Sequence, residues 1–271
     1  MVVVNSTSGI AVYSLDRTLK LHHPLSDITC SASNTSCLLT IFGTKSGLVC
    51  VLQLNREAIK GNEIPPESIK VHRLFAHKGS TKLVAINPRG TIGMSFGYVD
   101  TTVVFYDLKE FTVYAKGNLT QLQLNGIQLN CFCFDFKGDR TLMSKENDSV
   151  VTFTDYAAPS QRRESLLDRH NNAVYIVRIS SEGNSGLTAD VSNRIILWNF
   201  SGVTRNPIRE FNLLDVGYIT DIKLTLLSRF FVVKTTKKVI IYEPKYCVCL
   251  TQVWTDLVRV PLRRIQFRCG Y

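Results

Sequence analysis

Four residues in the stretch 77–107 have types and spacing that could do chemistry together: His77, Ser95, Asp100 and Tyr106. Histidine, serine and aspartate are the residue types of nucleophilic catalysis, in which the histidine takes the proton of the serine. The same groups can instead satisfy one another inside a core, because a turn aspartate accepts hydrogen bonds from a histidine ring and from backbone N–H groups. We interpret the four residues as such a buried structural strut.

The elements expected around these residues are short strands joined by turns. Residues 82–86 and the segment that ends near Phe96 read as two strands, and residues 88–90 between them read as a turn. Residues 102–106 are the third expected strand. A histidine that opens the unit, a serine on the second strand, an aspartate in the next turn and an aromatic residue six positions later are typical of a WD repeat.

The third-strand pattern recurs along the chain. The positions equivalent to Tyr106 are Tyr13, Leu52, Thr154, Trp198 and Tyr242, with successive gaps of 39, 54, 48, 44 and 44 residues. A period of about 40–45 residues with four short strands per unit is typical of WD propellers. The sequence therefore predicts an all-β WD40-type β-propeller that forms a single domain over residues 1–271. Six blades are favoured, and seven remain an alternative.

The individual units give more detailed expectations. The first unit lacks its innermost strand, and we expect the segment 262–267 to supply it and so to close the ring. The segment 55–67 is a polar insertion that should form a surface loop. In the fifth unit His170 takes the opening position and Ser192 takes the place of the turn aspartate.

The cysteines and histidines give no positive indication of a metal or a cofactor. No secretory signal is recognisable, so the eight cysteines are expected to be reduced thiols. Cys131 with Cys133, and Cys247 with Cys249, are each two residues apart and would share one face of a strand. We interpret them as small buried hydrophobic residues rather than zinc ligands. The adjacent histidines His22 and His23 would point to opposite faces of a strand, which does not suit a metal site.

The net charge of +10 and the pI near 9.3 favour an anionic partner, either RNA, an acidic protein or a lipid surface. No apolar run approaches the ~20 residues of a membrane helix, so no integral membrane association is expected. The blade-to-blade connector around 157–168 is one of three basic clusters. The candidate contacts with an anionic partner are Arg162, Arg163, Arg169, Lys234, Lys237, Lys238, Arg263 and Arg264. The alternative for each cluster is a solvated charged surface.

A resemblance to a known family adds to this interpretation. The segment FAHKGSTKLVAINPRGTIGMSFGYVDTTVVFYDL (75–108) resembles the AHKG blade of the PAK-interacting-protein-like nucleolar WD-repeat proteins. The pieces VVVNSTSGIAVYSLD (2–16) and FGTKSGLVCVLQLN (42–55) resemble the two preceding blades. The resemblance implies a scaffold in assembly of the large ribosomal subunit, in a setting where pre-ribosomal RNA is close. An intracellular location is expected, with the nucleus or nucleolus favoured and the cytoplasm as the alternative. Some members of the family also bind and inhibit a p21-activated-type kinase.

The expected function is thus a non-catalytic protein-interaction scaffold that is monomeric by itself and works within a multi-subunit assembly. No nucleophile elbow, phosphate-binding loop, dinucleotide fingerprint or zinc-protease motif is recognisable, so no enzymatic activity and no cofactor are expected. One alternative is a generic WD40 adaptor in ubiquitin ligation or vesicle trafficking. Another is a phosphoinositide-binding propeller, but its Phe/Leu-Arg-Arg-Gly motif fails because Arg264 is followed by Ile265 and Arg163 by Glu164.

Overall fold

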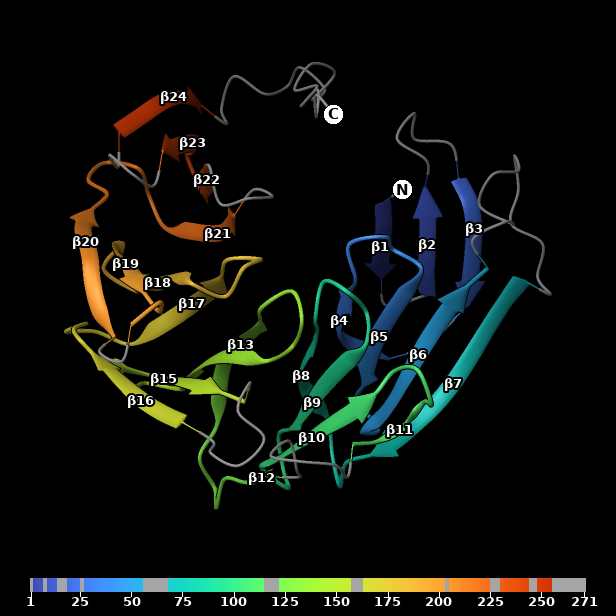
Figure 1. Cartoon of the computed structure of the whole chain (residues 1–271). Coiled ribbons are helices and arrows are strands. Elements are labelled where there is room, and N and C mark those ends of the chain that lie inside the picture. Colours follow the sequence, from blue (N-terminus) through green and yellow to red (C-terminus); the bar gives the residue numbers. More distant parts are fainter. Residues whose placement is uncertain are drawn as a thin grey trace.

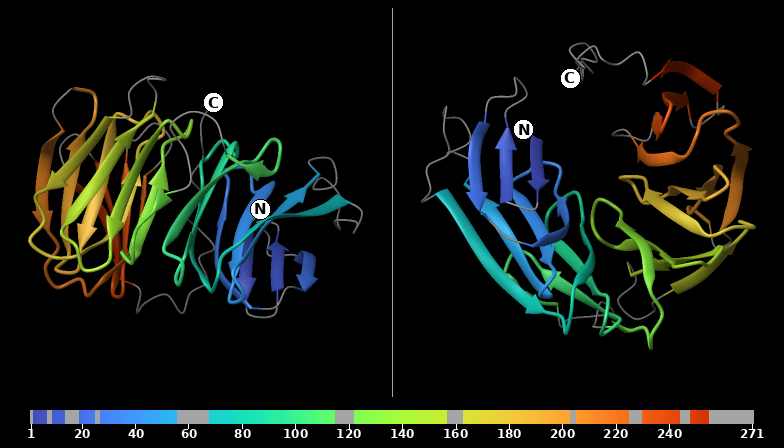
Figure 2. Two further views of the ribbon diagram at one scale, coloured as in Figure 1. Left: turned by 90° about the horizontal axis from the view of Figure 1, so that it is seen from below. Right: turned by 180° about the vertical axis from the view of Figure 1, so that it is seen from behind.

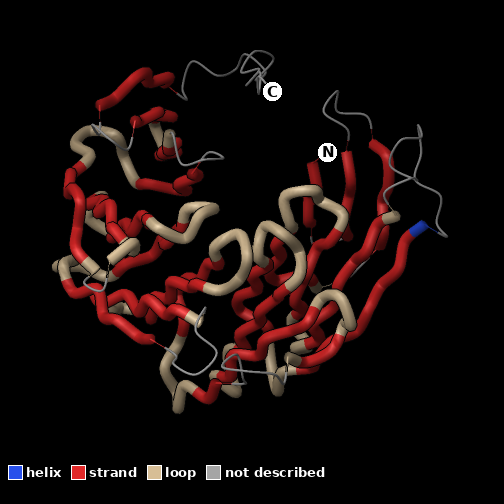
Figure 3. The backbone as a smooth tube through the Cα atoms, in the orientation of Figure 1, coloured by secondary structure: helices blue, strands red, loops and turns tan. Residues whose placement is uncertain are grey.

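The structure is a computed structural model that describes residues 2–6, 9–13, 19–24, 27–55, 68–114, 122–156, 163–202, 205–224, 230–243 and 248–254. Almost every regular element in these ranges is a β-strand (Figure 3). The strands form six antiparallel sheets that follow one another along the chain. The chain is therefore an all-β protein of serial antiparallel sheets, an arrangement consistent with propeller blades.

The first three sheets lie in the N-terminal half. The first contains β1 (Val2–Ser6), β2 (Gly9–Tyr13) and β3 (Leu19–Pro24). The second contains β4 (Ile28–Ser33), β5 (Leu39–Thr44), β6 (Leu48–Leu54) and β7 (Ile69–Ala76). The third contains β8 (Thr81–Ile86), β9 (Ile92–Gly97), β10 (Thr102–Asp107), β11 (Thr112–Val113) and β12 (Leu122–Gln123).

The last three sheets have four strands each. The fourth contains β13 (Leu129–Phe134), β14 (Arg140–Lys145), β15 (Val150–Asp155) and β16 (Arg163–Asp168). The fifth contains β17 (Val174–Ile179), β18 (Ser185–Asp190), β19 (Arg194–Asn199) and β20 (Asn206–Asn212). The sixth contains β21 (Ile219–Leu224), β22 (Phe231–Thr235), β23 (Lys238–Glu243) and β24 (Val248–Trp254).

The repeat read from the sequence is confirmed as a repeat of sheets. The six aligned positions fall on β2, β6, β10, β15, β19 and β23. Each of these strands pairs on one side with the strand before it in the chain, as the pattern predicts. The first sheet has three strands among the described residues, which is the expected incomplete unit. The predicted closing segment 262–267 and residues 56–67 of the predicted surface loop lie outside the described residues.

One connector prediction was wrong in part. Residues 157–168 were expected to link two units, but residues 163–168 form β16, the outermost strand of the fourth sheet. Its sequence RESLLD is mostly polar because an edge strand faces solvent, so it lacks the apolar pattern of an inner strand. Polar composition there indicated an edge rather than a loop.

The sheets follow one another around an open arc, with the first strand of each later sheet toward the inside (Figure 1). The inner strands β4, β8, β13, β17 and β21 are neighbours in that order. The outer strands β7, β16, β20 and β24 lie on the rim of the arc (Figure 1). A central cavity of about 740 Å³ is bounded by the inner strands of five sheets.

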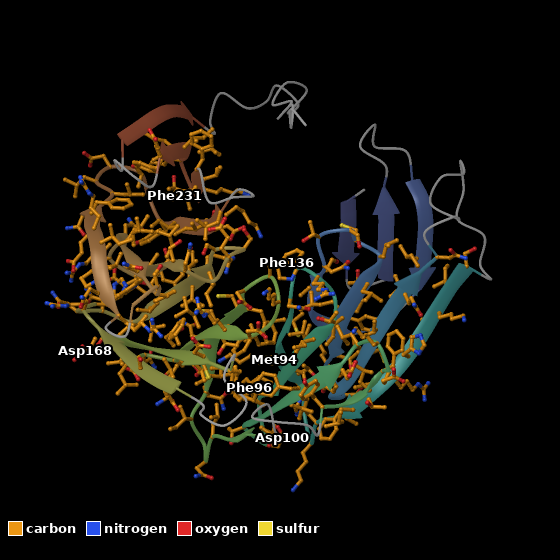
Figure 4. The ribbon with its side chains drawn as sticks, in the orientation of Figure 1. Met94, Phe96, Asp100, Phe136, Asp168 and Phe231 are labelled. Carbon is orange, nitrogen blue, oxygen red and sulfur yellow. The ribbon has the colours of Figure 1, made fainter. Side chains whose placement is uncertain are left out.

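The core consists of apolar clusters between consecutive sheets rather than one central mass. Ile41, Val84 and Tyr106 pack between the second and third sheets. Met94 and Phe96 belong to the cluster between the third and fourth sheets (Figure 4). Two further clusters join the fourth to the fifth and the fifth to the sixth sheet. Because a sheet packed on both sides buries both faces, β10 is buried along almost its whole length.

The loops gather at two opposite faces, since the strands run from one face to the other (Figure 2). We call one the connector face. It holds the turns between second and third strands (45–47, 98–101, 146–149, 191–193 and 236–237) and the links between sheets (77–80, 124–128, 169–173 and 213–218). We call the other the turn face. It holds the turns between first and second strands (34–38, 87–91, 135–139 and 180–184).

Candidate functional site

The structure joins the four residues named from the sequence in one buried chain of hydrogen bonds. His77 Nδ1 lies 3.0 Å from Asp100 Oδ2, and His77 Nε2 lies 2.8 Å from Ser95 Oγ. Ser95 Oγ lies 2.6 Å from the hydroxyl of Tyr106. β9 supplies the serine, β10 the tyrosine, and the connector face supplies the histidine and the aspartate. Asp100 also accepts the backbone N–H of Lys78 at 3.1 Å.

The charge states of this network fix the direction of its hydrogen bonds. Burial lowers the pKa of His77 below its ordinary value, although Asp100 opposes the shift. Burial by itself would raise the pKa of Asp100, but the hydrogen bonds from Lys78 N–H and His77 hold it below its ordinary value. At neutral pH a neutral His77 therefore donates from Nδ1 to an ionised Asp100 and accepts from Ser95 at Nε2. Ser95 in turn accepts from Tyr106.

This geometry contains a serine, a histidine and an aspartate in the order of a catalytic triad, but the serine is buried. Ser95 is fully buried, and its oxygen already has two partners, His77 and Tyr106. Burial also raises the pKa of Tyr106 well above its ordinary value, which keeps that hydroxyl protonated as a donor. With all of these partners inside the protein, the arrangement suits a structural clamp that ties the turn 98–101 to β9 and β10.

A second network of the same kind lies in the fifth sheet. His170 Nδ1 lies 2.9 Å from Asp190 Oδ2, and His170 Nε2 lies 2.7 Å from Thr188 Oγ1. Trp198 Nε1 donates to Thr188 at 2.8 Å. The ionised Asp190 can only accept, so a neutral His170 donates to it from Nδ1 and accepts from Thr188 at Nε2, while Thr188 accepts from the indole N–H of Trp198. Burial likewise lowers the pKa of His170 below its ordinary value.

The sequence prediction for this second network was wrong in one position. Ser192 was placed as the counterpart of Asp100, but the acceptor is Asp190, and Ser192 Oγ donates to it at 2.6 Å. Asp190 is the last residue of β18 and lies eight residues before Trp198, so counting back six residues from Trp198 stops short of the acceptor. The histidine-to-hydroxyl spacing of 18 residues is the same in both networks and would have located Thr188.

The networks of His77 and His170 lie beside the connector face, and several large apolar side chains on that face are exposed. Of the twelve exposed large hydrophobic side chains among the described residues, six lie on the connector face. They are Tyr98, Val99, Ile127, Val191, Leu214 and Tyr218. Leu214 is 79% and Tyr218 72% exposed.

These residues lie in two groups, each on a turn and the connector that follows it, and we call the two groups apolar patches. The first apolar patch is Tyr98, Val99 and Ile127, and it is held together because Gln128 donates to the carbonyl of Tyr98 at 2.9 Å. The second apolar patch is Val191, Leu214 and Tyr218.

Asn193 holds the second apolar patch in place. It donates to Gly217 O at 2.6 Å and accepts from Ile219 N at 3.1 Å. In both patches a side-chain amide, of Gln128 or of Asn193, ties a turn to the following connector through hydrogen bonds with the backbone, which holds the apolar side chains on a fixed frame.

Polar side chains separate the two patches. Glu146, Asn147, Arg169 and Asn171 are exposed in the turn and connector of the fourth sheet. The face therefore combines apolar anchors with charges of both signs. Such a surface matches the composition of a protein-binding surface more closely than the uniformly basic surface of a nucleic-acid binder.

The predicted contacts with an anionic partner do not form one cluster. Arg169, Lys234 and Lys237 are exposed and lie on or close to the connector face. Lys238 is only 9% exposed, because it begins β23 inside the sixth sheet, so it does not share the exposed surface of Lys234 and Lys237. Arg162, Arg263 and Arg264 lie outside the described residues, as does the side chain of Arg163.

The described cysteines have the character of buried thiols. Burial raises the pKa of Cys131 to about 11 and that of Cys133 to about 12. The second CxC pair cannot be placed, because Cys247 and the side chain of Cys249 lie outside the described residues. Within the described ranges no group of three or more His, Cys, Asp or Glu residues has an arrangement suited to a metal ion. In those same ranges no helix has the length and apolar character needed to cross a membrane.

Comparison of the sequence with models of protein families found no match. Comparison with curated proteins also found none.

Proposed function

We propose that the chain is a WD40-type β-propeller that works as a non-catalytic scaffold for protein interactions. The observation that carries the proposal is the connector face, where the two apolar patches stand on loops clamped by the buried networks of His77 and His170. A rigid frame with apolar tips and a mixed polar surround has the properties of a protein-docking surface, since little conformational entropy is lost on binding.

We further propose that the partners belong to an assembly intermediate of the large ribosomal subunit in the nucleus or nucleolus. The resemblance of residues 75–108 to a blade of the nucleolar WD-repeat family and the net charge of +10 support this setting. The exposed cations Arg169 and Lys237 would then contact the acidic surroundings of a ribonucleoprotein particle.

The scaffold proposal is tested by affinity purification of tagged variants. One variant removes the first apolar patch (Tyr98→Ser with Ile127→Ser), and a second removes the other patch (Leu214→Ser with Tyr218→Ser). The control removes two exposed side chains from the rim, Leu166→Ser with Ile208→Ser, whose exposures of 68% and 52% lie within the range of the two patch pairs. We expect the patch variants to lose the partners that the native chain and the rim control retain. Equal recovery of those partners by all three variants would overturn the proposal.

The setting is tested separately by sedimentation of the tagged native chain. We expect it to migrate with precursors of the large ribosomal subunit and to be released at high salt. Exclusive migration with membranes or with a ubiquitin ligase would remove the ribosomal setting and would leave the scaffold proposal standing.

A further inference from the structure

A second cavity lies on the turn face, between the second and third sheets and opposite the connector face. It has a volume of about 560 Å³. Leu39, Gln53 and Lys70 are aligned across β5, β6 and β7, so they share one face of the second sheet and form one wall. Arg89, in the turn between β8 and β9, contributes to the lining from the third sheet.

The lining has the chemistry of an anion site. Among the described residues that line it, the two charged ones, Lys70 and Arg89, are cations, and none is a carboxylate. Both side chains are exposed, and within the described residues the structure gives neither of them an acidic partner. Gln53 accepts a hydrogen bond from His72 Nε2 at 3.0 Å through its carbonyl oxygen, which leaves its NH₂ group as a further donor.

The remaining walls indicate what accompanies the anion. Leu39 and Leu54 provide an apolar side, whereas Ser36 and Ser68 provide hydroxyl groups. A volume of about 560 Å³ exceeds that of a bare anion and suits an anionic group with a short organic stem. Two cations match a dianion better than a monoanion, since each can make its own charge-assisted hydrogen bond.

We propose that this cavity binds a phosphomonoester group, with Arg89 and Lys70 as its charged contacts and Gln53 as a neutral donor. The site is separate from the two apolar patches, so it does not depend on the proposed scaffold function. The group can come from a phosphorylated side chain or from a small phosphate ester, and both present the same dianion to the cavity.

The neighbouring sheet supplies a matched control. Lys137 occupies the same place in the turn between β13 and β14 as Arg89 does in its own turn, one residue before a glycine of positive φ. It is exposed on the same face and does not line the cavity. Lys137→Gln therefore removes the same charge from the same kind of turn without changing the cavity.

The test is isothermal titration of the full chain at constant ionic strength. The ligands are inorganic phosphate, N-acetyl-phosphoserine methylamide, glycerol phosphate and, as a monoanionic comparison, N-acetyl-aspartate methylamide. We expect Arg89→Gln and Lys70→Gln each to weaken phosphate binding by about tenfold, and Lys137→Gln to leave it unchanged. Because the substituted side chains are exposed, we expect all three variants to fold. Thermal unfolding of each variant without ligand checks this.

The outcomes separate the sources and decide the proposal. Tighter binding of the phosphoserine derivative identifies a phosphorylated side chain as the ligand, and tighter binding of glycerol phosphate identifies a small ester. The proposal is overturned if neither ester binds, if the aspartate derivative binds as tightly as phosphoserine, or if Lys137→Gln has the same effect as Arg89→Gln. None of these results bears on the variants of the connector face.

Discussion

At the scale of single residues, the third and fifth sheets each contain a buried histidine bonded to an aspartate, but the aspartate comes from a different position in each sheet. In both sheets the Nδ1–H of the buried histidine donates to an ionised carboxylate. Asp100 comes from the turn after β9, whereas Asp190 is the last residue of β18. Gly97 stands where Asp190 stands, two residues after the hydroxyl, and a Cβ there would collide with Asp100 and His77. The small residue at one position and the carboxylate at the other are thus coupled.

This coupling predicts the outcome of a double-mutant cycle. We expect Gly97→Asp alone to cost at least about 2 kcal/mol of unfolding free energy, since it adds bulk and a second carboxylate beside His77. Asp100→Ser alone should cost about 1–3 kcal/mol, because it leaves the buried histidine without its acceptor. The pair should cost less than the sum by about 1 kcal/mol or more, as measured by urea unfolding.

Asn147→Asp is the control for that cycle. It adds a carboxylate to the corresponding turn of the fourth sheet, where the connector 124–128 contains no histidine. Its cost should stay within about 0.5 kcal/mol. Strict additivity of Gly97→Asp and Asp100→Ser would contradict the shared site.

The buried histidines also predict a pH dependence of stability. The pKa values of His77 and His170 are lowered by burial, so the unfolded chain binds their protons first. Stability is therefore complete above the unfolded histidine pKa of about 6.5 and falls as the pH drops below it. The lowered pKa values of Asp100 and Asp190 add a further loss under stronger acid.

The measurement is the melting temperature between pH 7.5 and 5.5. We expect the native chain to lose stability steadily over this interval. His77→Gln should melt lower at pH 7.5 but lose less on acidification, because one of the protonating groups is absent. A native melting temperature that rises toward pH 5.5 would show that these histidines are not the groups in control.

At the scale of elements, the turn face is built as a series of interlocking turns. Asn34, Asn87, Asp135 and Ser180 each accept the backbone N–H five residues later through a side-chain oxygen. A glycine of positive φ follows three residues after Asn87, Asp135 and Ser180. These glycines are Gly90, Gly138 and Gly183. Each glycine packs against the accepting side chain of the preceding sheet, so successive turns fit over one another.

Two glycines separate the backbone cost from the packing cost of such a turn. Gly90 has a φ of 79°, and a Cβ there would lie 2.6 Å from Asn34 Nδ2. Gly126 has a φ of 87° and open space around it. We expect Gly126→Ala to cost about 1 kcal/mol through strain alone, and Gly90→Ala to cost about 1–3 kcal/mol more. Chemical denaturation measures both, and equal costs would mean that the interlock contributes nothing.

At the scale of the whole molecule, stability should spread from sheet to sheet. The described core is divided into clusters between neighbours, so a sheet at either end of the arc is covered on one side only unless the ends meet. We propose that the ends do meet, through residues 262–267 beside β1, in a ring of six sheets. Closure would remove the exposed edge that β1 otherwise presents.

Truncation after Trp254 tests this proposal. If the final segment pairs with β1, its removal should lower the melting temperature and speed hydrogen exchange at the amides of Val2–Ser6 that do not bond to β2. The amides of β17–β19, in the middle of the series, are the internal control and should keep their protection. Unchanged exchange at β1 would contradict closure by this segment.

The sequence by itself determined the class of the fold and the places of its central strands. A third strand that is buried on both faces is largely apolar, so β6, β10, β15, β19 and β23 were recognisable without a structure, and the same repeat placed β2. The same holds for His77, Ser95, Asp100 and Tyr106, because a buried polar group needs a partner at a defined spacing. The outer strand β16 was missed because an edge strand is under no such constraint.

Only the tertiary structure decided which side chains share a surface. Asp190, and not Ser192, is the acceptor because the carboxylate comes from the end of β18 instead of from the turn, and this is apparent only once the strands are paired. The two apolar patches and the cavity of Lys70 and Arg89 draw on residues from separate turns and sheets. Their proximity depends on how the sheets pack around the arc, and periodicity within one strand contains no information about that packing.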